Sequence, residues 1–591
     1  MTSMTSSTGG DVGRISWISC PADGAAQASR LFQAVDRCIL AQMTILLLSV
    51  ALVLAAGCGT DEASFGISAP SVVLDVDLDA RRHRVGRLIG WNIGAGTRYS
   101  PPDGRRHPEW RSPEIAEMVR RLSLVRAANR DRPIVRFSGL QIDGALGGDG
   151  YHFFDFADPS SEVSADDNVA PFEYMAIIDE IDAEPLIMLN FGSGTSAEAA
   201  RYARHLTGNE STDPMVAARI FWGRDAPWAV SHYEIGNEIY EPFNTGFLGD
   251  GLYSYANPNA LDGGDPLWYG RPASDVDDYT ERAIEYVEAV LEVQPDARFY
   301  IPLTQSTWDG WGGPSASLPA LAPLLELPAV AGVVVHQYVA DDGRTGYGWE
   351  PAQDAWLLSS ADFYRPLFRE LATMLDSLSR EEPLELTVTE YFGAAQDRMG
   401  RTFAADLSIA DLLMLYADAE VDLALEHMTL AEDPGSNPIV QEAHKPFFVQ
   451  GNVVTDRPSY TLTKLVADHL WQYVATVNET LMPTARQPLA SGGYEYDLVS
   501  ALALVSDDDS EGSVLLLNRD LTQEHVVELT VRSHDRVTEA RGVVPDDVWI
   551  ETLQVPGETV PTTFEQQGAR VRVVLPPHSF AAIAIERSSL R

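Results

Sequence analysis

Two glutamates stand where short apolar runs of the sequence end, and their side chains could perform acid–base chemistry together. Glu238 closes Tyr-Glu-Ile-Gly-Asn-Glu (233–238), and Glu390 closes Leu-Thr-Val-Thr-Glu (386–390). A carboxylate at the end of a buried strand costs free energy unless it is paired, solvated or used. Hydrolysis of a glycosidic bond needs two carboxyl groups, one to protonate the leaving oxygen and one to attack or to activate water. The alternative is that both are ordinary loop acids, solvated or salt-bridged.

The composition restricts the class of protein. The chain has 591 residues, of which 45% are hydrophobic, enough for two or three domains around a large core. A formal net charge of −44 repels nucleic acid and anionic lipid and disfavours strongly anionic substrates, so we expect no nucleic-acid partner. The three cysteines are Cys20, Cys38 and Cys58, which leaves no disulfide or cysteine-bound metal site beyond residue 58.

Residues 1–57 have the features of an export leader. Residues 44–57 form an apolar run that is short for a bilayer span but suits the core of a signal peptide. The run ends in Leu-Ala-Ala-Gly-Cys (54–58), which resembles a bacterial lipoprotein signal with Cys58 as the lipidated residue. An ordinary cleaved signal and a misplaced translation start are the alternatives. We therefore expect that the protein is exported to the periplasm, the outer membrane or the cell surface. It would contact the membrane only through a lipid anchor, and residues 58–70 would form a tether.

From residue 86 to 465, short β-like runs alternate with longer helical stretches. The runs are Leu88–Asn92, Ile134–Phe137, Pro185–Phe191, Ser231–Ile235, Arg298–Leu303, Gly332–His336, Glu385–Glu390 and Val421–Met428. The helical candidates include Pro113–Ala128, Ala197–Leu206, Asp275–Val293, Ala361–Ser379 and Ser408–Ala419. Eight runs with helices in most of the gaps predict an α/β fold, a (β/α)8 TIM barrel. A doubly wound open sheet is the alternative, but no glycine-rich phosphate loop follows the first run.

Residues 466–591 change to alternating strands broken by turn residues, which predicts a C-terminal antiparallel β-sandwich domain. The acidic run 507–512 lacks the ligand spacing of a calcium loop, and we interpret it as a hairpin turn. Within residues 71–85, Val-Val-Leu-Asp-Val-Asp-Leu (72–78) alternates apolar and acidic residues as a half-exposed strand does. We expect this N-terminal strand to join the sandwich.

The ends of the predicted barrel strands carry polar and aromatic residues that packing does not explain. In a barrel, the C-terminal ends of the strands share one mouth, so these side chains should meet there. They are Trp91 and Asn92, Arg136, Asn190, Asn237 and Glu238, His336 and Tyr338, and Glu390.

Several stretches of the sequence also resemble a known family. Gly-Asn-Glu after the fourth run and Glu-Tyr after the seventh resemble the retaining clan A (β/α)8 glycoside hydrolases. Within that clan, residues 190–202, 233–240 and 516–522 are most similar to the α-L-arabinofuranosidase family. The resemblance covers about residues 72–590. It implies a carbohydrate substrate, such as a plant or algal polysaccharide or oligosaccharide, and neither a metal nor a cofactor.

The resemblance also implies a role for each residue at the mouth. Glu238 would be the acid/base and Glu390 the nucleophile, with their carboxyl groups about 5–5.5 Å apart. Asn237 would hydrogen-bond the sugar 2-hydroxyl, and Tyr338 would donate to Glu390 beside His336. Arg136 would lie beneath the nucleophile and hold it ionised. Further candidates for sugar contacts are Trp91, Asn92, Asn190, Trp308 and Trp311.

Two departures from the family leave the sugar open. Ser138-Gly139-Leu140 stands where the family usually has a Pro-Gly-Gly turn, and Ile93-Gly94-Ala95 follows Asn92 where the family usually has an acidic residue. The alternatives are another enzyme of the clan (a β-xylosidase, β-glucuronidase or endo-glycanase) and a non-catalytic carbohydrate-binding surface lipoprotein. The linkage, exo or endo action and oligomeric state also stay open.

Overall fold

The structure is a computed structural model. The residues that it describes are 67–94, 113–138, 171–192, 194–221, 223–240, 273, 275–304, 311–339, 351–378, 380–392, 402–427, 446–450, 453–487, 493–531, 536–543 and 559–587. The predicted leader, the lipidation of Cys58 and the sugar contact of Trp308 therefore lie outside the described residues. No helix within the described ranges is both long and apolar enough to cross a membrane.

Eight parallel strands close into a barrel, which confirms the predicted (β/α)8 fold. In order they are β2 (Gly90–Gly94), β3 (Ile134–Ser138), β4 (Glu184–Leu189), β5 (His232–Ile235), β6 (Arg298–Pro302), β7 (Val330–Tyr338), β8 (Glu385–Phe392) and β9 (Leu423–Glu426). The pairing of Trp91 on β2 with Glu426 on β9 closes the ring. Strands such as β7 are apolar along most of their length because they are buried on both faces.

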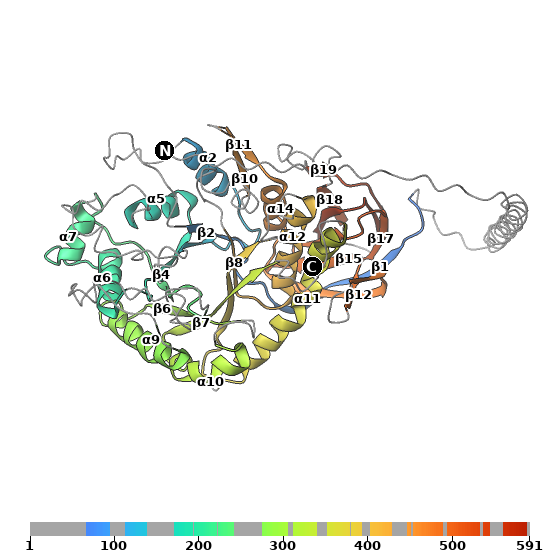
Figure 1. Ribbon diagram of the computed structural model, residues 1–591. Helices are drawn as coiled ribbons and strands as arrows, with labels where there is room; N and C mark the ends of the chain where they lie inside the picture. The colour runs from blue at the N-terminus through green and yellow to red at the C-terminus, as the bar shows by residue number, and fades with distance from the viewer. Residues whose placement is uncertain are drawn as a thin grey trace, which may run out of the picture. The chain divides into compact units, whose positions relative to one another are not determined.

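Helices connect these strands and cover the barrel (Figure 1). Those described are α2 (Pro113–Leu122), α5 (Pro171–Ile181), α6 (Ser196–Thr207), α7 (Pro214–Phe221), α9 (Val276–Leu291), α10 (Pro314–Leu325), α11 (Pro351–Asp376), α12 (Phe403–Asp418) and α14 (Pro458–Ala467). Asp275 and Thr402 cap α9 and α12 by accepting hydrogen bonds from the backbone of the first turn. Helix α11 begins ten residues before the predicted start at Ala361, because its first turns also bury apolar side chains such as Trp356 and Leu357.

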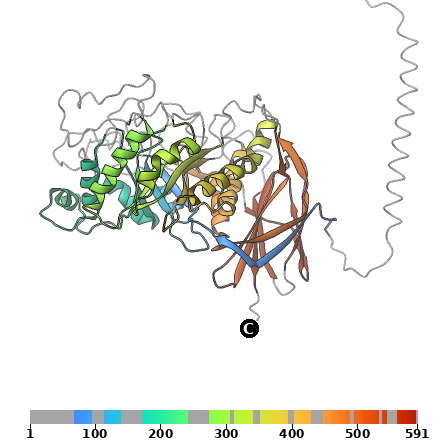
Figure 2. The ribbon, with the colours of Figure 1, turned by 90° about the horizontal axis from the view of Figure 1, so that it is seen from below.

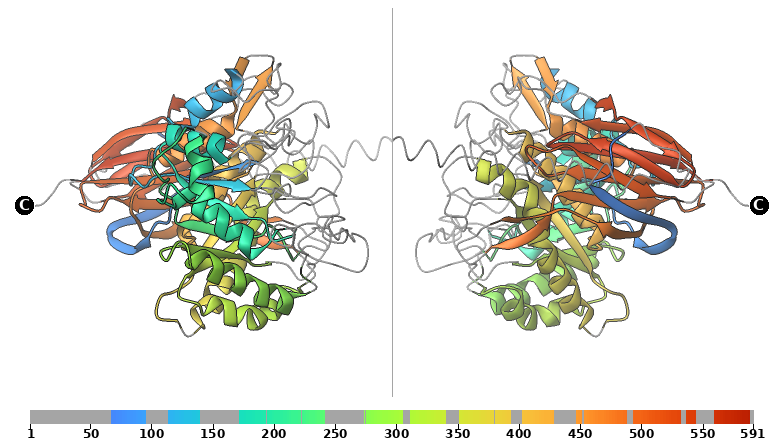
Figure 3. Two further views of the ribbon diagram at one scale, coloured as in Figure 1. Left: turned by 90° about the vertical axis from the view of Figure 1, so that its left-hand side faces the viewer. Right: turned by 90° about the vertical axis from the view of Figure 1, so that its right-hand side faces the viewer.

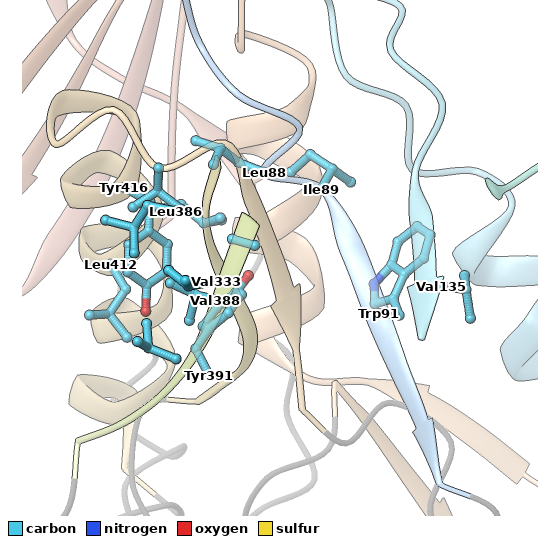
Figure 4. Packing of buried hydrophobic residues seen from close by; sticks show 14 of the residues in the cluster. Leu88, Ile89, Trp91, Val135, Val333, Leu386, Val388, Tyr391, Leu412 and Tyr416 are labelled. Carbon is cyan, nitrogen blue, oxygen red and sulfur yellow. The ribbon is translucent and has the colours of Figure 1, made fainter. Parts of the chain in front are cut away.

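The main core lies between the barrel strands and these helices. Figure 4 shows Val333 of β7 and Val388 of β8 close to Leu412 and Tyr416 of α12. All four side chains are buried, and a buried side chain of this size contributes about 1.5–3 kcal/mol through the hydrophobic effect. This packing holds β7 and β8, the two strands that carry His336 and Glu390, in fixed register.

The remaining strands build a ten-stranded sheet in the order β19-β18-β22-β16-β15-β12-β1-β17-β21-β20. Their bounds are β1 (Val72–Arg84), β12 (Tyr473–Leu481), β15 (Val499–Val505), β16 (Glu511–Asn518), β17 (His525–Thr530), β18 (Arg536–Val543), β19 (Thr559–Pro561), β20 (Phe564–Gln567), β21 (Arg570–Leu575) and β22 (Ser579–Glu586). Two separate hairpins are β10 (Phe447–Gln450) with β11 (Val453–Asp456), and β13 (Thr484–Gln487) with β14 (Tyr494–Asp497).

The N-terminal strand β1 lies inside the C-terminal sheet. It pairs antiparallel with β12 and parallel with β17, and Figures 2 and 3 show it in blue among the orange and red strands. Val72, Leu74 and Val76 are buried in a second core, while Asp75 and Asp77 are exposed. Apolar and acidic residues alternate in this strand because one of its faces packs on the core and the other faces solvent.

A buried arginine joins this sheet to the barrel helices. Arg519 follows β16 and donates two hydrogen bonds of 2.8 Å to Asp411 on α12 and one of 2.6 Å to Asp362 on α11. The side chains of Arg519 and Asp411 are each 1% exposed. The stretch 516–522, which carries part of the family resemblance, thus contains one of the residues that join the sheet to the barrel helices.

We expect Arg519→Ala to lower the free energy of unfolding by about 3–5 kcal/mol, because Asp411 would be left as an unpaired buried charge. Urea denaturation followed by circular dichroism measures the change. Arg298→Ala is the control, since it removes an exposed ion pair with Glu382, and such pairs contribute little. A similar loss in both variants would contradict a special role for Arg519.

Candidate active site

The backbone after β5 turns sharply and carries Asn237 and Glu238. Gly236 has a φ of 82°, in the left-handed region that favours glycine, and Glu238 has a φ of 46°. A positive φ costs free energy for a residue with a side chain, and such conformations gather at functional sites. Glu390 needs no such turn, because it lies within β8.

The carboxyl groups of Glu238 and Glu390 meet the ring of His336 at the barrel mouth. One oxygen of each carboxyl group and one ring nitrogen all lie within 4.8 Å of one another. Carboxyl pairs of retaining glycosidases lie about 5–5.5 Å apart, and those of inverting enzymes about 6.5–9.5 Å apart. An approach this close is nearer to the separation of a retaining pair than to that of an inverting pair.

Arg136 lies beneath this pair and is fully buried. Its Nη1 donates to Glu390 Oε1 at 2.6 Å, and its Nη2 donates to Asn237 Oδ1 at 2.8 Å. Glu234 on β5 accepts from Nε at 2.7 Å and from Nη2 at 2.5 Å, a bidentate pair. Burial acts to lower the pKa of Arg136, but Glu234 and Glu390 raise it above its usual value. Arg136 is thus a fixed positive charge that links β5 and β8.

The two oxygens of Glu390 have different partners. Oε1 accepts from Arg136, and Oε2 accepts from the Tyr338 hydroxyl. The Nδ1 atoms of His336 and His427 each lie 3.6 Å from Oε2. Burial acts to raise the pKa of Glu390, but His336, His427, Arg136 and Tyr338 together hold it well below its usual range. The carboxylate is therefore ionised at neutral and mildly acidic pH, as a nucleophile must be.

His336 connects the two carboxyl groups. Its Nδ1 lies 2.8 Å from Glu238 Oε1, and its Nε2 lies 3.2 Å from the Thr389 hydroxyl. Burial acts to lower the pKa of His336, but the charges of Glu390 and Glu238 raise it overall. Glu238 is the more exposed of the two acids, at 15% against 5% for Glu390. This exposure suits a group that must exchange protons with a leaving group and with water.

The remaining residues predicted to contact the sugar are buried asparagines and tryptophans that pack in the core. Asn92 is fully buried and donates to the backbone oxygen of Thr389 at 3.3 Å, so it supports the strand beneath Glu390. Asn190 directly follows β4, and its backbone oxygen accepts from the Tyr286 hydroxyl. Trp311 packs among tyrosines and is 6% exposed.

The predicted sugar contact of Trp91 has no support in the structure. Its side chain is 1% exposed, belongs to the main core and lies close to Val135 (Figure 4). Successive side chains of a strand point to opposite faces, so Trp91 and Asn92 cannot both face the barrel interior.

Sequence reasoning missed Glu234 and His427. Glu234 stands in the middle of the buried strand β5, where an acidic residue requires a partner, and this was a usable signal. His427 follows β9, at the end of the eighth predicted run, so the strand-end argument applies to it as well. Its ring stacks on Phe392 and lies near Tyr338.

Two further acids are buried: Glu426 is the last residue of β9, and Asp406 lies in the first turn of α12. Glu426 accepts from the Thr463 hydroxyl at 3.4 Å, and Asp406 accepts from Arg457 at 3.3 Å. Burial, opposed in part by Arg457 and by hydrogen bonds, raises the pKa of Glu426 to about 7 and that of Asp406 to about 6. We assign neither acid a role in the chemistry at the mouth and expect both to affect stability.

We expect Glu426→Gln to change how stability depends on pH. The folded carboxyl keeps its proton up to about pH 7, whereas the unfolded one releases it near pH 4.5. Because the unfolded state then binds fewer protons, wild-type stability falls across this window by an amount on the order of 2–3 kcal/mol from this group. Glutamine removes that loss, so the stability of the variant relative to wild type should rise from pH 4.5 to 7.5 in urea denaturation. A constant difference across this range would contradict the prediction, and exposed Glu285→Gln is the control.

Comparison with known proteins finds sequence relatives of low identity and solved structures of similar fold. No family model matches the chain. It is 21% identical over 220 residues to "Probable alpha-L-arabinofuranosidase C" of Aspergillus fumigatus, which covers 35% of this chain and 37% of that protein. It is 26% identical over 112 residues to the "Intracellular exo-alpha-L-arabinofuranosidase" of Bacteroides ovatus, 17% of this chain and 22% of that one. The matches thus span little more than a third of the curated relatives at most.

Solved structures are similar over most of the chain. The glycoside hydrolase family 51 arabinofuranosidase of Xanthomonas axonopodis pv. citri aligns with a TM-score of 0.67 at 14% identity, covering 88% of this chain and all of that one. A family 44 xyloglucanase of Paenibacillus polymyxa aligns with a TM-score of 0.55 at 11% identity, over 88% and 100% of the two chains. The chain therefore has the fold of the family 51 arabinofuranosidases, a TIM barrel with a β-sandwich domain.

Proposed function

We propose that this protein is a retaining glycoside hydrolase of the α-L-arabinofuranosidase type, with Glu390 as nucleophile and Glu238 as acid/base. One observation carries the proposal. A buried carboxylate held ionised by Arg136 and Tyr338 lies within 4.8 Å of a second, more exposed carboxyl group. The substrate class comes from the relatives, whose names describe arabinofuranosidases. Plant or algal polysaccharides and oligosaccharides are the source that we propose.

The mechanism has two displacements. In the first, Glu238 donates its proton to the glycosidic oxygen while Glu390 attacks the anomeric carbon, so the bond to the leaving group breaks and a glycosyl ester forms. In the second, Glu238 removes a proton from water, the water attacks the same carbon, and Glu390 leaves as a carboxylate. Asn237, oriented by Arg136, would bind the sugar 2-hydroxyl and stabilise the oxocarbenium-like transition state. No step requires a metal or a cofactor.

A second candidate is another retaining activity of the same clan, such as a β-xylosidase, β-glucuronidase or endo-glycanase. The departures after the first and second strands favour it, because those positions shape the sugar pocket rather than the chemistry. The similarity in fold to a xyloglucanase supports the same possibility.

Hydrolysis of a panel of nitrophenyl glycosides separates these candidates. We expect the highest kcat/KM on the α-L-arabinofuranoside, and NMR should show that the first sugar released keeps the anomeric configuration of the substrate. Highest activity on a β-xyloside or β-glucuronide would favour the second candidate. An inverted first product would contradict the retaining mechanism.

We also propose that the protein is exported and anchored through lipidated Cys58, on the basis of the Leu-Ala-Ala-Gly-Cys sequence alone. Expression in a bacterial host followed by fractionation tests this. The wild type should enter the membrane fraction, and Cys58→Ser should not.

A further inference from the structure

We propose that the catalytic centre is also a reversible zinc site, in which Zn²⁺ binds Glu238, His336 and Glu390 and thereby blocks the enzyme. Among the described residues, these three form the one group whose ligand atoms converge closely enough for a metal ion. Three protein ligands of nitrogen and oxygen type, with water in the fourth position, are the usual set of an open zinc site. The inhibition of hydrolysis by Zn²⁺ rests on the proposed function, whereas the binding of Zn²⁺ to these residues does not.

The distances require only small movements of the two glutamates. Zinc bonds of about 2.0–2.2 Å place the ligand atoms of a tetrahedral site about 3.3–3.6 Å apart. His336 Nδ1 lies 2.8 Å from Glu238 Oε1 and 3.6 Å from Glu390 Oε2. The two carboxylate oxygens lie within 4.8 Å of each other, so that edge would shorten slightly.

The charges around the centre favour a divalent cation. Arg136 would oppose one, but Glu234 already neutralises it in a bidentate pair. Glu238 and Glu390 add two further carboxyl groups beside this pair, so three acids gather around the guanidinium of Arg136. The net charge of −44 also raises the local concentration of cations.

Two neighbours complete the site. The Thr389 hydroxyl lies 3.2 Å from His336 Nε2 and keeps Nδ1 directed at the carboxylates, which is the usual role of an outer partner of a zinc ligand. His427 Nδ1 is buried, has no hydrogen-bond partner among the described residues and lies 3.6 Å from Glu390 Oε2. A buried ring nitrogen without a partner is rare, and a zinc-bound water could donate to it.

The ligand types select zinc over the hard cations. Mg²⁺ and Ca²⁺ prefer six or more oxygen ligands, whereas zinc accepts imidazole and four-fold coordination. His336 Nδ1 and Glu238 Oε1 share a proton at 2.8 Å, and zinc must displace it from between them.

Titration of the full chain with Zn²⁺ against a chromogenic chelator at pH 7.5 tests the site without any substrate. We expect one more zinc bound by the wild type than by Glu238→Gln or Glu390→Gln, whose affinity should fall at least about 100-fold. Thr389→Val should weaken binding about tenfold, as loss of an outer partner does. Exposed Glu285→Gln should bind as the wild type, and Mg²⁺ should not compete. The comparison between variants also subtracts any zinc held by Cys20, Cys38 and Cys58.

A wild type that binds no more zinc than Glu390→Gln overturns the proposal. If hydrolysis is observed, Zn²⁺ should inhibit it competitively at the concentration that gives half occupancy, and EDTA should reverse the inhibition. Occupancy without inhibition overturns the blocking role. A chain that binds zinc at this site but hydrolyses no glycoside contradicts the proposed function and leaves the zinc site standing.

Discussion

Glu390→Ala should abolish turnover, with kcat lower by on the order of 10⁴–10⁶-fold, because the covalent intermediate can no longer form. Azide should restore reaction by entering the space that the carboxylate leaves and attacking the anomeric carbon directly. Since this replaces two displacements by one, the glycosyl azide should have the inverted configuration. Steady-state kinetics with an activated aryl glycoside, followed by NMR of the azide adduct, measures both effects.

The matched control for this variant lies on the same strand. Glu385 begins β8 at the opposite end of the barrel, where it accepts from the Tyr300 hydroxyl, so Glu385→Gln should keep its activity. Circular dichroism and thermal unfolding show whether Glu390→Ala is folded, which we expect because Glu234 still pairs with Arg136. Folded Glu390→Ala with near wild-type turnover would remove Glu390 from the mechanism.

Glu238→Ala should lose activity according to the leaving group of the substrate. For a poor leaving group, such as an alcohol or a second sugar, we expect a loss of about 10²–10⁴-fold, because the departing oxygen no longer receives a proton. For a dinitrophenyl leaving group the first step needs no acid, so the glycosyl-enzyme should form and accumulate. A burst of dinitrophenol followed by slow turnover would show this in stopped-flow absorbance.

Azide distinguishes this variant from the first. It needs no general base, so it should attack the glycosyl-enzyme of Glu238→Ala and yield a glycosyl azide that retains the configuration of the substrate. If both variants gave the same anomer, the assignment of one glutamate as nucleophile and the other as acid/base would be wrong.

The two roles that we propose rest on the unequal surroundings of two similar carboxyl groups. Glu390 is surrounded by Arg136, Tyr338 and two imidazoles, which hold its pKa low in spite of burial. Glu238 contacts His336 and is the more exposed acid. Two carboxyl groups with opposite duties need such a difference. Here most of it comes from residues on β3 and β7 and from His427 directly after β9, rather than from the neighbours of either glutamate in the chain.

The fold class and the two central glutamates could be predicted from the sequence because their signals are local. Buried parallel strands appear as short apolar runs, helices as longer periodic stretches, and the ends of the strands as the places where polar residues follow apolar ones. Glu238, Glu390, Arg136, His336 and Tyr338 were all found in this way, and the barrel brings all five together. β1 was recognised by the same kind of local alternation.

Only the tertiary structure decided which of these side chains are in contact, because contact depends on how distant strands align around the closed barrel. Glu234 and Arg136 are 98 residues apart in sequence, yet the pairing of β3, β4 and β5 brings them into a bidentate contact. Closure of the ring through β9 brings His427 to the nucleophile, and the alternation of β2 turns Trp91 into the core. These outcomes depend on strand register and closure, which are set by packing over the whole barrel and leave no local mark in the sequence. The sequence by itself thus identified the two carboxyl groups that we propose for the reaction, while the folded barrel decided which charges surround each of them.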